Sequence, residues 1–429
     1  MFGFANFLLL ALFAAAVFDL IFALARGGGL RGALHGLWNT PHLLFEQQLA
    51  EWRLQLGRIL FAAGLAAYEI SVVFCNSMAR QNWAWVQGVM SPVLEWLAFL
   101  CFGAKILFGT RYTWRELLAG GALYFIARWV YFNSQNIWWI CIVVAVLAAK
   151  DVPLRRPLQV YFASGCAAMA VVLALHFAGI VAPDLTSERM GALRGTYGYG
   201  HPNTFGGLVF GLVLAYALLR AQKVRWVDCL LVFAVGVFLL VGPASRSAAL
   251  CTLALAVGLV FCRLRAGHSV PRWWPGTCAG MVGLTAAVSY LLPLLVIKVG
   301  PWNNDIGPAW LAKLDSLLTC RISLTWMAYR LLDVKIAGQV FNWPTVDNSF
   351  AFALFQFGPV VAALLGILFA AALLGHAKQG RRVEVCCLFA MLAYAYMEVQ
   401  PFHLTTNPTA LLLCGAVFAQ TSARWQKIE

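Results

Sequence analysis

Long apolar runs separated by short polar turns extend along almost the whole chain. A helix needs about 20 apolar residues to cross the hydrocarbon core of a bilayer, within a range of about 17–25. Some of the runs are shorter than this, so we expect about 12 or 13 transmembrane helices. The predicted spans are residues 4–25, 59–77, 89–109, 116–132, 137–149, 159–182, 203–220, 226–242, 247–263, 275–299, 350–375, 383–400 and 407–420.

Two polar segments, 183–203 and 300–349, are too long to be simple turns. Neither is long enough for a soluble domain, so residues 1–429 are predicted to form a single integral membrane domain. The first apolar run has no positive charge before it, and Arg26 and Arg31 follow it. A secretory signal has its positive region first, so we interpret this run as a retained helix.

The segment 300–349 contains a predicted amphipathic helix at residues 309–333, which hold no proline. At about 100° per residue, aspartates, serines and threonines share one side and most leucines share the other. Arg321 falls in the middle of the apolar side. A guanidinium that faces protein or lipid requires an anion, which could be a nearby carboxylate or a ligand.

Composition agrees with the pattern, because 62% of the residues are hydrophobic, 11% are charged and the mean hydropathy is +0.78. Soluble domains average about 45–50% apolar and about 25% charged residues. These values predict an all-α polytopic transmembrane helix bundle. Of the 12 cysteines, all except Cys320 lie in apolar runs and none has metal-ligand spacing, so we expect helix packing, no disulfide and no metal site.

The formal charge of +14 could indicate a nucleic-acid partner, but its distribution indicates membrane orientation instead. Most of the 31 lysines and arginines lie in alternate turns, and basic residues stay on the cytoplasmic side. The C-terminus is therefore expected inside the cell, and the segments 183–203 and 300–349 are expected on the outer face. No nucleic-acid partner is expected.

Arginines on the predicted outer side work against this orientation rule and require another explanation. Guanidinium groups bind phosphate through a planar, forked array of donors. A group of them at the outer membrane surface suits a lipid that carries a pyrophosphate. The candidates in or beside short polar motifs are Arg189, Arg194, Arg246 and Arg321.

The first polar motif runs from Arg194 to Gly207 and alternates glycines with Tyr197 and Tyr199, whose rings could stack on sugars. Asn203 is placed to cap the next span, and His201 either faces a substrate or bonds locally.

In the second motif, Ser245-Arg246-Ser247, Arg246 begins a span and needs a partner, a wet cavity or a route to the headgroups. The third comprises Arg321 and its neighbours on the predicted amphipathic helix. In the last, Asp347 and Asn348 precede a long span, where Asp347 could act as a base or only as a cap.

These motifs, in this order, resemble the superfamily of O-antigen polymerases and ligases, and most closely the Wzy-type polymerases of capsule and exopolysaccharide clusters. The resemblance covers roughly residues 190–375. The matching pieces are Gly198 to Gly206, Ser245-Arg246-Ser247, Leu317 to Ile322 followed by Gly338, and Val346 to Phe350 followed by Gly358.

The resemblance implies a GT-C-like membrane glycosyltransferase that uses no metal or nucleotide sugar. Such enzymes join repeat units linked to undecaprenyl pyrophosphate on the outer face of the cytoplasmic membrane, in concert with a flippase and a chain-length regulator. Arg246 and Arg321 are then expected to bind the donor pyrophosphate, and Arg194 the acceptor's or the donor's. Ligases commonly have His-Asn where this chain has Asp347-Asn348, so either Asp347 or His201 would be the base.

Two alternatives stay open at this stage. A ligase would transfer finished glycan to a different acceptor, and Asp347 in place of histidine favours the polymerase. A transporter of lipid-linked oligosaccharide would use ionisable residues within the spans, although these could equally pair between helices. Those residues are Asp19, Glu69, Glu95, Arg128, His176 and Glu398.

Overall fold

The computed structural model describes residues 41–42, 51–110, 112–181, 187–189, 192–296 and 307–418. The predicted span 4–25 and parts of the segments 183–203 and 300–349 lie outside the described residues. Side chains are described from Trp52 to Phe418, except for residues 111–115, 182–193 and 297–306.

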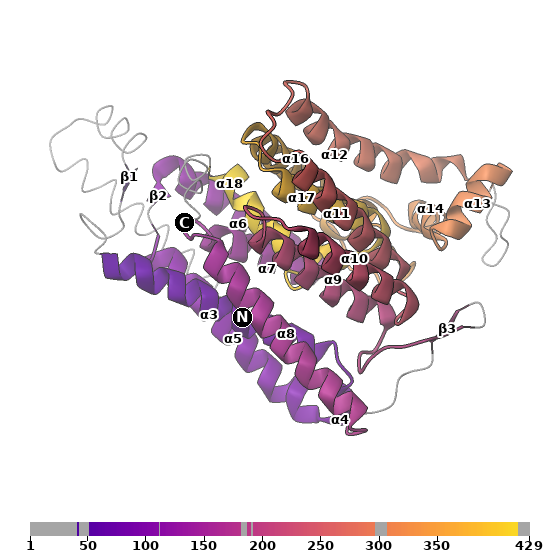
Figure 1. Ribbon diagram of the computed structural model, residues 1–429, viewed down its shortest axis with the longest axis horizontal. Helices are drawn as coiled ribbons and strands as arrows, with labels where there is room; N and C mark the ends of the chain where they lie inside the picture. Colours follow the sequence, from indigo (N-terminus) through magenta and orange to yellow (C-terminus); the bar gives the residue numbers. More distant parts are fainter. Residues whose placement is uncertain are drawn as a thin grey trace.

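The described residues are predominantly helical (Figure 1). The longer helices are α3 (Glu51–Cys75), α5 (Ser91–Phe108), α6 (Trp114–Ser134), α7 (Trp138–Ala148), α8 (Arg155–Phe177), α9 (Pro202–Leu219), α10 (Trp226–Val241), α11 (Arg246–Leu264), α12 (Trp274–Leu291), α13 (Ala309–Leu317), α14 (Arg321–Leu331), α16 (Pro359–Lys378) and α17 (Arg382–Met397).

Short helical segments join these helices or extend them. They are α4 (Ala79–Asn82), η1 (Val86–Met90), η2 (Leu292–Leu295), α15 (Ser349–Phe352), η3 (Ala353–Phe357), η4 (Gln400–Phe402), η5 (Pro408–Leu413) and α18 (Cys414–Val417). Two small antiparallel pairs complete the described chain: β1 (Pro41–His42) with β2 (Tyr112–Thr113), and β3 (Ser187–Arg189) with β4 (Ala192–Arg194).

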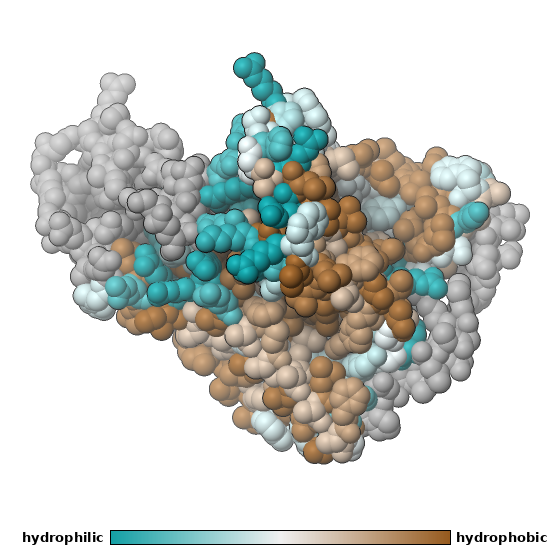
Figure 2. Space-filling model, viewed as in Figure 1, coloured by the Kyte–Doolittle hydropathy of each residue, from teal (hydrophilic) through white to brown (hydrophobic). Residues whose placement is uncertain are grey.

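The expectation of an all-helical membrane protein is confirmed. Every predicted span from 59–77 to 407–420 overlaps a helix, and 7 helices of the described chain are long and apolar enough to cross a membrane. Large apolar side chains such as Ile59, Leu230, Val257 and Ile367 are 63–68% exposed. Figure 2 shows hydrophobic residues over much of the visible surface, which lipid would cover.

Two of the shorter predicted spans are internal segments. Helix α7 has 11 residues and is buried along almost its whole length, and η5 is fully buried, whereas α18 is half-buried after Cys414. At 1.5 Å per residue a helix of this length covers about half of the hydrocarbon core. The predicted spans 137–149 and 407–420 are therefore helical, but each is too short to cross the hydrocarbon core alone.

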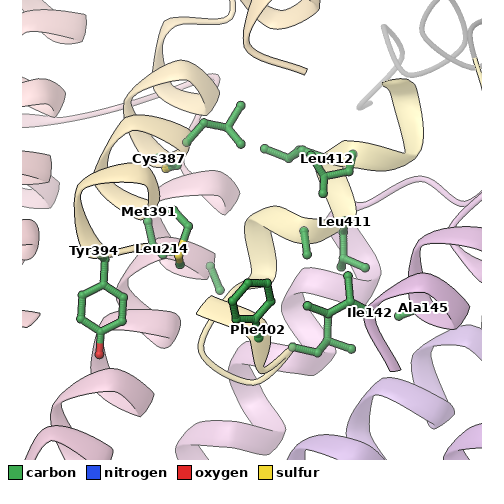
Figure 3. Close-up of a cluster of buried hydrophobic side chains, with 14 of the residues drawn as sticks. Ile142, Ala145, Leu214, Cys387, Met391, Tyr394, Phe402, Leu411 and Leu412 are labelled. Carbon is green, nitrogen blue, oxygen red and sulfur yellow. The ribbon is translucent and has the colours of Figure 1, made fainter. Parts of the chain in front are cut away.

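Figure 3 shows the part of the core where these internal segments meet α9 and α17. Ile142 of α7, Leu214 of α9, Met391 of α17 and Leu411 of η5 are all buried, with exposures of 0–4%. Phe402, 6% exposed, lies between them just before η5. Burial of apolar surface contributes about 25 cal/mol per Å², so this packing stabilises the arrangement of α9 and α17 around the internal segments.

The helices place two kinds of turn at opposite ends of the bundle (Figure 1). We name one the basic end: it holds the turns at 149–155, 220–225, 265–273 and 379–381, which line common cavities or bond to one another. We name the other the motif end: it holds residues 194–203, 243–247, 318–321, 347–349 and 398. The basic turns and the polar motifs thus lie at opposite ends, as the sequence predicts. The side of the membrane that each end faces stays a prediction.

The predicted helix 309–333 is wrong in one respect, because the chain breaks between α13 and α14. Thr319 and Cys320 adopt left-handed backbone conformations, with φ of 59° and 64°. Asp315, expected on the polar face, is fully buried and accepts hydrogen bonds from the backbone nitrogens of Ile322 (2.7 Å) and Ser323 (3.2 Å). This carboxylate satisfies the first turn of α14, which then begins at Arg321.

The predicted span 350–375 begins with a short helix and a π-helical turn, and α16 starts only after Gly358. A side chain at Gly358, whose φ is +88°, would lie 2.1 Å from the carbonyl oxygen of Ile336. Gly338, with φ of +74°, approaches the carbonyl oxygen of Gln356 equally closely. The two glycines let the chain after α14 pack against the segment that follows Asp347 and Asn348.

Candidate functional site

Glu398 lies at the centre of the polar network at the motif end. It follows α17 directly and is 5% exposed. Its Oε1 accepts hydrogen bonds from Arg321 Nη2 at 2.5 Å, Ser247 Oγ at 2.8 Å and Asn203 Nδ2 at 3.0 Å. These donors come from α14, α11 and α9, so one carboxylate joins motifs that are far apart in the sequence.

Arg321 is held on every side of its guanidinium and is 7% exposed. Besides Glu398, it donates to Ser247 Oγ at 3.3 Å, to the carbonyl oxygens of Leu318 (2.8 Å) and Met397, and to Thr319 Oγ1. The break before α14 supplies Leu318 and Thr319 as acceptors. A guanidinium fixed in this way is preorganised, and little side-chain entropy remains to be lost when an anion binds.

Arg194 reaches the same network from the end of β4 and is 6% exposed. Its Nη2 donates to Asn203 Oδ1 at 2.9 Å and to the carbonyl oxygen of Ala244 at 3.2 Å. Because Asn203 also donates to Glu398, its amide links Arg194 to the carboxylate that Arg321 binds. The structure thus brings two of the predicted phosphate-binding arginines to either side of one buried anion.

Arg246 begins α11 beside this network and is exposed, whereas its neighbours on both sides are buried. Ser247 donates to Glu398, and the hydroxyl of Ser245 is buried without a hydrogen-bond partner among the described residues. A side chain at Gly206 would lie 2.3 Å from Ser245 Oγ, so this glycine lets α9 approach the turn. The spacing explains why the first and second motifs meet.

Asn348, rather than Asp347, caps α15. Its Oδ1 accepts from the backbone nitrogens of Phe350 (2.9 Å) and Ala351 (3.1 Å), and its Nδ2 donates to the carbonyl oxygen of Tyr396 at 3.1 Å. The alternative that Asp347 is the cap is therefore wrong. The amide of Asn348, predicted to bind substrate, is instead occupied by protein groups that fix the end of α17.

Asp347 is the least constrained acidic group of the site. It is half-buried, and its carboxylate forms no hydrogen bond or ion pair with any described residue. Ser349 Oγ donates to the backbone carbonyl oxygen of Glu398 at 2.6 Å, which holds the chain around Asp347 against the end of α17. Asp347 is thus placed next to the network without being tied into it.

The remaining residues of the first motif have mainly structural positions. His201 is the exposed N-cap of α9, and its Nδ1 accepts from the backbone nitrogen of Asn203 at 3.1 Å. The prediction that Asn203 itself is the cap is therefore wrong. Tyr197 stacks on Phe205 with ring centroids 5.0 Å apart, and Tyr199 is fully buried, so its ring does not face a substrate as predicted.

Arg189 lies in β3, and its side chain is outside the described part of the chain. In the described ranges, no three histidine, cysteine, aspartate or glutamate side chains gather as potential metal ligands. The side chains that converge at the motif end are arginines, amides, hydroxyls and carboxylates. This set of groups suits an anionic ligand and a proton transfer.

The importance of Glu398 was only partly visible in the sequence. A carboxylate inside an apolar run signals a partner, since an unpaired charge within the membrane is costly. The partner, Arg321, is 77 residues away, and no local pattern links the two. Ser247 and Asn203 lie in recognised motifs, but their shared acceptor could not be read from those motifs.

The chain matches no protein-family model, and it has no match among curated proteins or solved structures.

Proposed function

We propose that the protein is a membrane glycosyltransferase that polymerises oligosaccharide repeat units carried on undecaprenyl pyrophosphate. The observation that carries the proposal is the convergence of Arg194 and Arg321 on Glu398, at the end of the bundle opposite the basic turns. Arg194, Arg246 and Arg321 lie together at this end, where the orientation rule expects few basic residues. A diphosphate would give these guanidinium groups a shared anion.

In this proposal Glu398 occupies the place of an anion while no substrate is bound. Breaking a buried ion pair leaves an uncompensated charge, so Arg321 needs an anion at all times. A diphosphate offers several oxygens to the forked guanidinium and can take Nη2 over from Glu398. Arg321, with Arg194 or Arg246 as the second cation, then stabilises the negative charge on the departing pyrophosphate, at about 3–4 kcal/mol per group.

Asp347 is the proposed general base. A sugar hydroxyl of the acceptor attacks the anomeric carbon of the donor, and the bond from that carbon to the pyrophosphate oxygen breaks. The pyrophosphate leaves with the electron pair, and Asp347 takes the proton of the hydroxyl. Asp347 is chosen over His201 because Ser349, two residues after it, bonds to the backbone of Glu398, and because its carboxylate has no hydrogen-bonded partner in the described chain.

A small apolar cavity lies beside the proposed site. It measures about 80 Å³ and is lined by Ser349, whose hydroxyl donates to the backbone carbonyl oxygen of Glu398. Its other walls include Tyr290, Phe350 and Phe369. The arginine network therefore has apolar surface within one residue of Asn348.

The proposal is tested by reconstituting the protein in vesicles with lipid-linked repeat units and separating the products by length. Arg321→Lys keeps the charge but loses the fork, so we expect polymer formation to fall at least about a hundredfold. Arg330→Lys is the matched control, since Arg330 lies on the same helix but is exposed and faces the ring of Trp326. The control should give the wild-type ladder.

Normal polymer length from Arg321→Lys at wild-type expression would reject the proposed role of the arginine network. The products also distinguish a ligase. Loss of a polymerase leaves single repeat units on the lipid, whereas loss of a ligase leaves long lipid-linked chains. If the inactive Arg321→Lys variant accumulates long lipid-linked chains, the reaction of the wild-type protein is ligation and not polymerisation.

A further inference from the structure

We propose a second anion site at the basic end, which holds the head group of an anionic phospholipid between α3 and α8. A cavity of about 690 Å³ lies there, lined by Arg58 of α3 and by Arg155 and Arg156 of α8. No aspartate or glutamate is among its lining residues. The site is separate from the network around Glu398 and does not depend on the proposed polymerase activity.

The three arginines retain their capacity to bind an anion. None of them forms an ion pair or a side-chain hydrogen bond with a described residue, and the Nε of Arg58 is buried without a partner. The orientation rule explains why basic residues lie at this end, but it does not require them to line one cavity. Three guanidinium groups around a shared space, with no acidic wall, suit a phosphate.

The first turn of α8 adds to this preference. Arg155 and Arg156 are its first residues, and the N-cap residue, Leu154, has no side chain that can accept from the backbone nitrogens. The N-terminus of a helix of 23 residues carries a partial positive charge and unsatisfied donors, both of which favour an anion.

A second cavity at the same end is a useful contrast. It measures about 400 Å³ and is lined by Lys223, Arg263 and Arg381, but Glu384 is also part of its wall. Arg382, which lines it too, donates to the carbonyl oxygens of Arg265 and His268. Protein groups therefore satisfy part of the positive charge there, whereas no carboxylate is among the described residues that line the cavity between α3 and α8.

The surroundings of the cavity favour a lipid over a soluble phosphate. Ile59, which lines it, is 63% exposed, and Leu56 on the preceding turn is 42% exposed. Trp52 is 59% exposed at the start of the same helix, where an indole ring prefers the headgroup level. A head group among the arginines would place its acyl chains along this apolar side of α3. Basic cavities between membrane helices are known to bind anionic head groups in this way.

The test compares lipid retention by native mass spectrometry of the full chain, purified in mild detergent with added phosphatidylglycerol or phosphatidylcholine. Wild type should retain phosphatidylglycerol selectively. Arg58→Gln/Arg155→Gln/Arg156→Gln should bind it roughly a hundredfold more weakly, since each basic residue near the membrane surface contributes a several-fold factor.

The matched control is Arg265→Gln/Arg272→Gln/Lys378→Gln, which removes the same charge from the same end outside this cavity. It should retain phosphatidylglycerol as wild type does. If the cavity variant does not fold, Arg156→Gln alone changes one exposed side chain and should weaken retention roughly fivefold.

Equal losses in the two triple variants would show that only net charge matters and would overturn the site. Undiminished retention by the cavity variant would overturn it as well. Displacement of the lipid by inorganic phosphate would assign the cavity to a soluble anion and overturn the lipid assignment. Selective loss in the cavity variant, with no displacement by phosphate, supports the proposal.

Discussion

Buried charges lie at both ends of the bundle, but they are arranged differently. At the basic end, Lys150 Nζ pairs with both Glu116 and Asp151 at 3.3 Å, and Lys105 Nζ donates to Thr110 Oγ1 at 2.6 Å and to the carbonyl oxygen of Lys150. Each of these cations has several protein partners. The cluster ties together α5, α6 and the turn between α7 and α8, and we assign it a structural role.

The motif end contains polar groups that form no hydrogen bond with described residues. Glu398 is shared by donors from three helices, but Asp347 next to it bonds to no described residue, and the buried hydroxyl of Ser245 has no hydrogen-bond partner there. A purely structural cluster would satisfy these groups, because an unsatisfied buried polar group costs about 1–3 kcal/mol. The contrast agrees with the proposed ligand site at the motif end and with a structural role for the basic-end lysine cluster.

The largest effect is expected from substitution of Asp347, whose carboxylate is not hydrogen-bonded to the described residues of the network. Asp347→Asn should lower the rate of polymerisation by about 10²–10⁴, because it removes the proposed general base. Folding should be unaffected, since the carboxylate makes no hydrogen bond with described residues. The rate is measured with reconstituted lipid-linked repeat units and the melting temperature with the purified protein.

Asp333→Asn is the control, because Asp333 is an exposed aspartate that lies, like Asp347, between α14 and α15. It should leave both the rate and the melting temperature unchanged. Equal effects of the two substitutions would remove the distinction between Asp347 and an ordinary surface carboxylate.

A second test compares the central carboxylate of each cluster. Glu398→Gln removes the one carboxylate that pairs with the buried Arg321 in the described chain, and breaking such a pair costs about 3–5 kcal/mol of stability. Glu116→Gln leaves Lys150 paired with Asp151, and the lost contact between Glu116 and Lys150 contributes about 1.5–3 kcal/mol. Thermal unfolding in detergent should therefore show the larger loss for Glu398→Gln.

Added inorganic pyrophosphate sharpens the same comparison. It should raise the melting temperature of Glu398→Gln more than that of wild type, because the competing carboxylate charge is gone. It should not rescue Glu116→Gln beyond the wild-type effect. Equal stabilisation of all three proteins would place the diphosphate away from Glu398.

The sequence predicted what depends on local pattern. The spans were found because apolar length is a local property, and the separation of basic turns from polar motifs followed from their alternation. Whether a short apolar run crosses the membrane depends on which helices pack around it, and this is not a local property of the sequence. The run at 137–149 forms α7, which the surrounding helices cover almost completely.

The candidate site was predicted in its residues but not in its connections. Arg194, Asn203 and Arg321 were identified from motifs, yet Glu398, which joins them, comes from a different part of the chain. The break before α14 was also invisible, because left-handed backbone at Thr319 and Cys320 is not expected of those residue types. Without that break Arg321 would not begin a helix or reach Leu318 and Thr319.

The smallest predicted effect separates the two candidate bases. His201→Ala removes an exposed N-cap whose Nδ1 accepts from Asn203, so we expect about 1 kcal/mol of lost stability and a rate within tenfold of wild type. His201→Asn should restore the cap and the stability, since asparagine is a preferred N-cap residue. A rate loss of about 10²–10⁴ in both variants would make His201 the base. Asp347 would then have no catalytic role, and the base that distinguishes the motif end from the lysine cluster would be His201, at the N-terminus of α9.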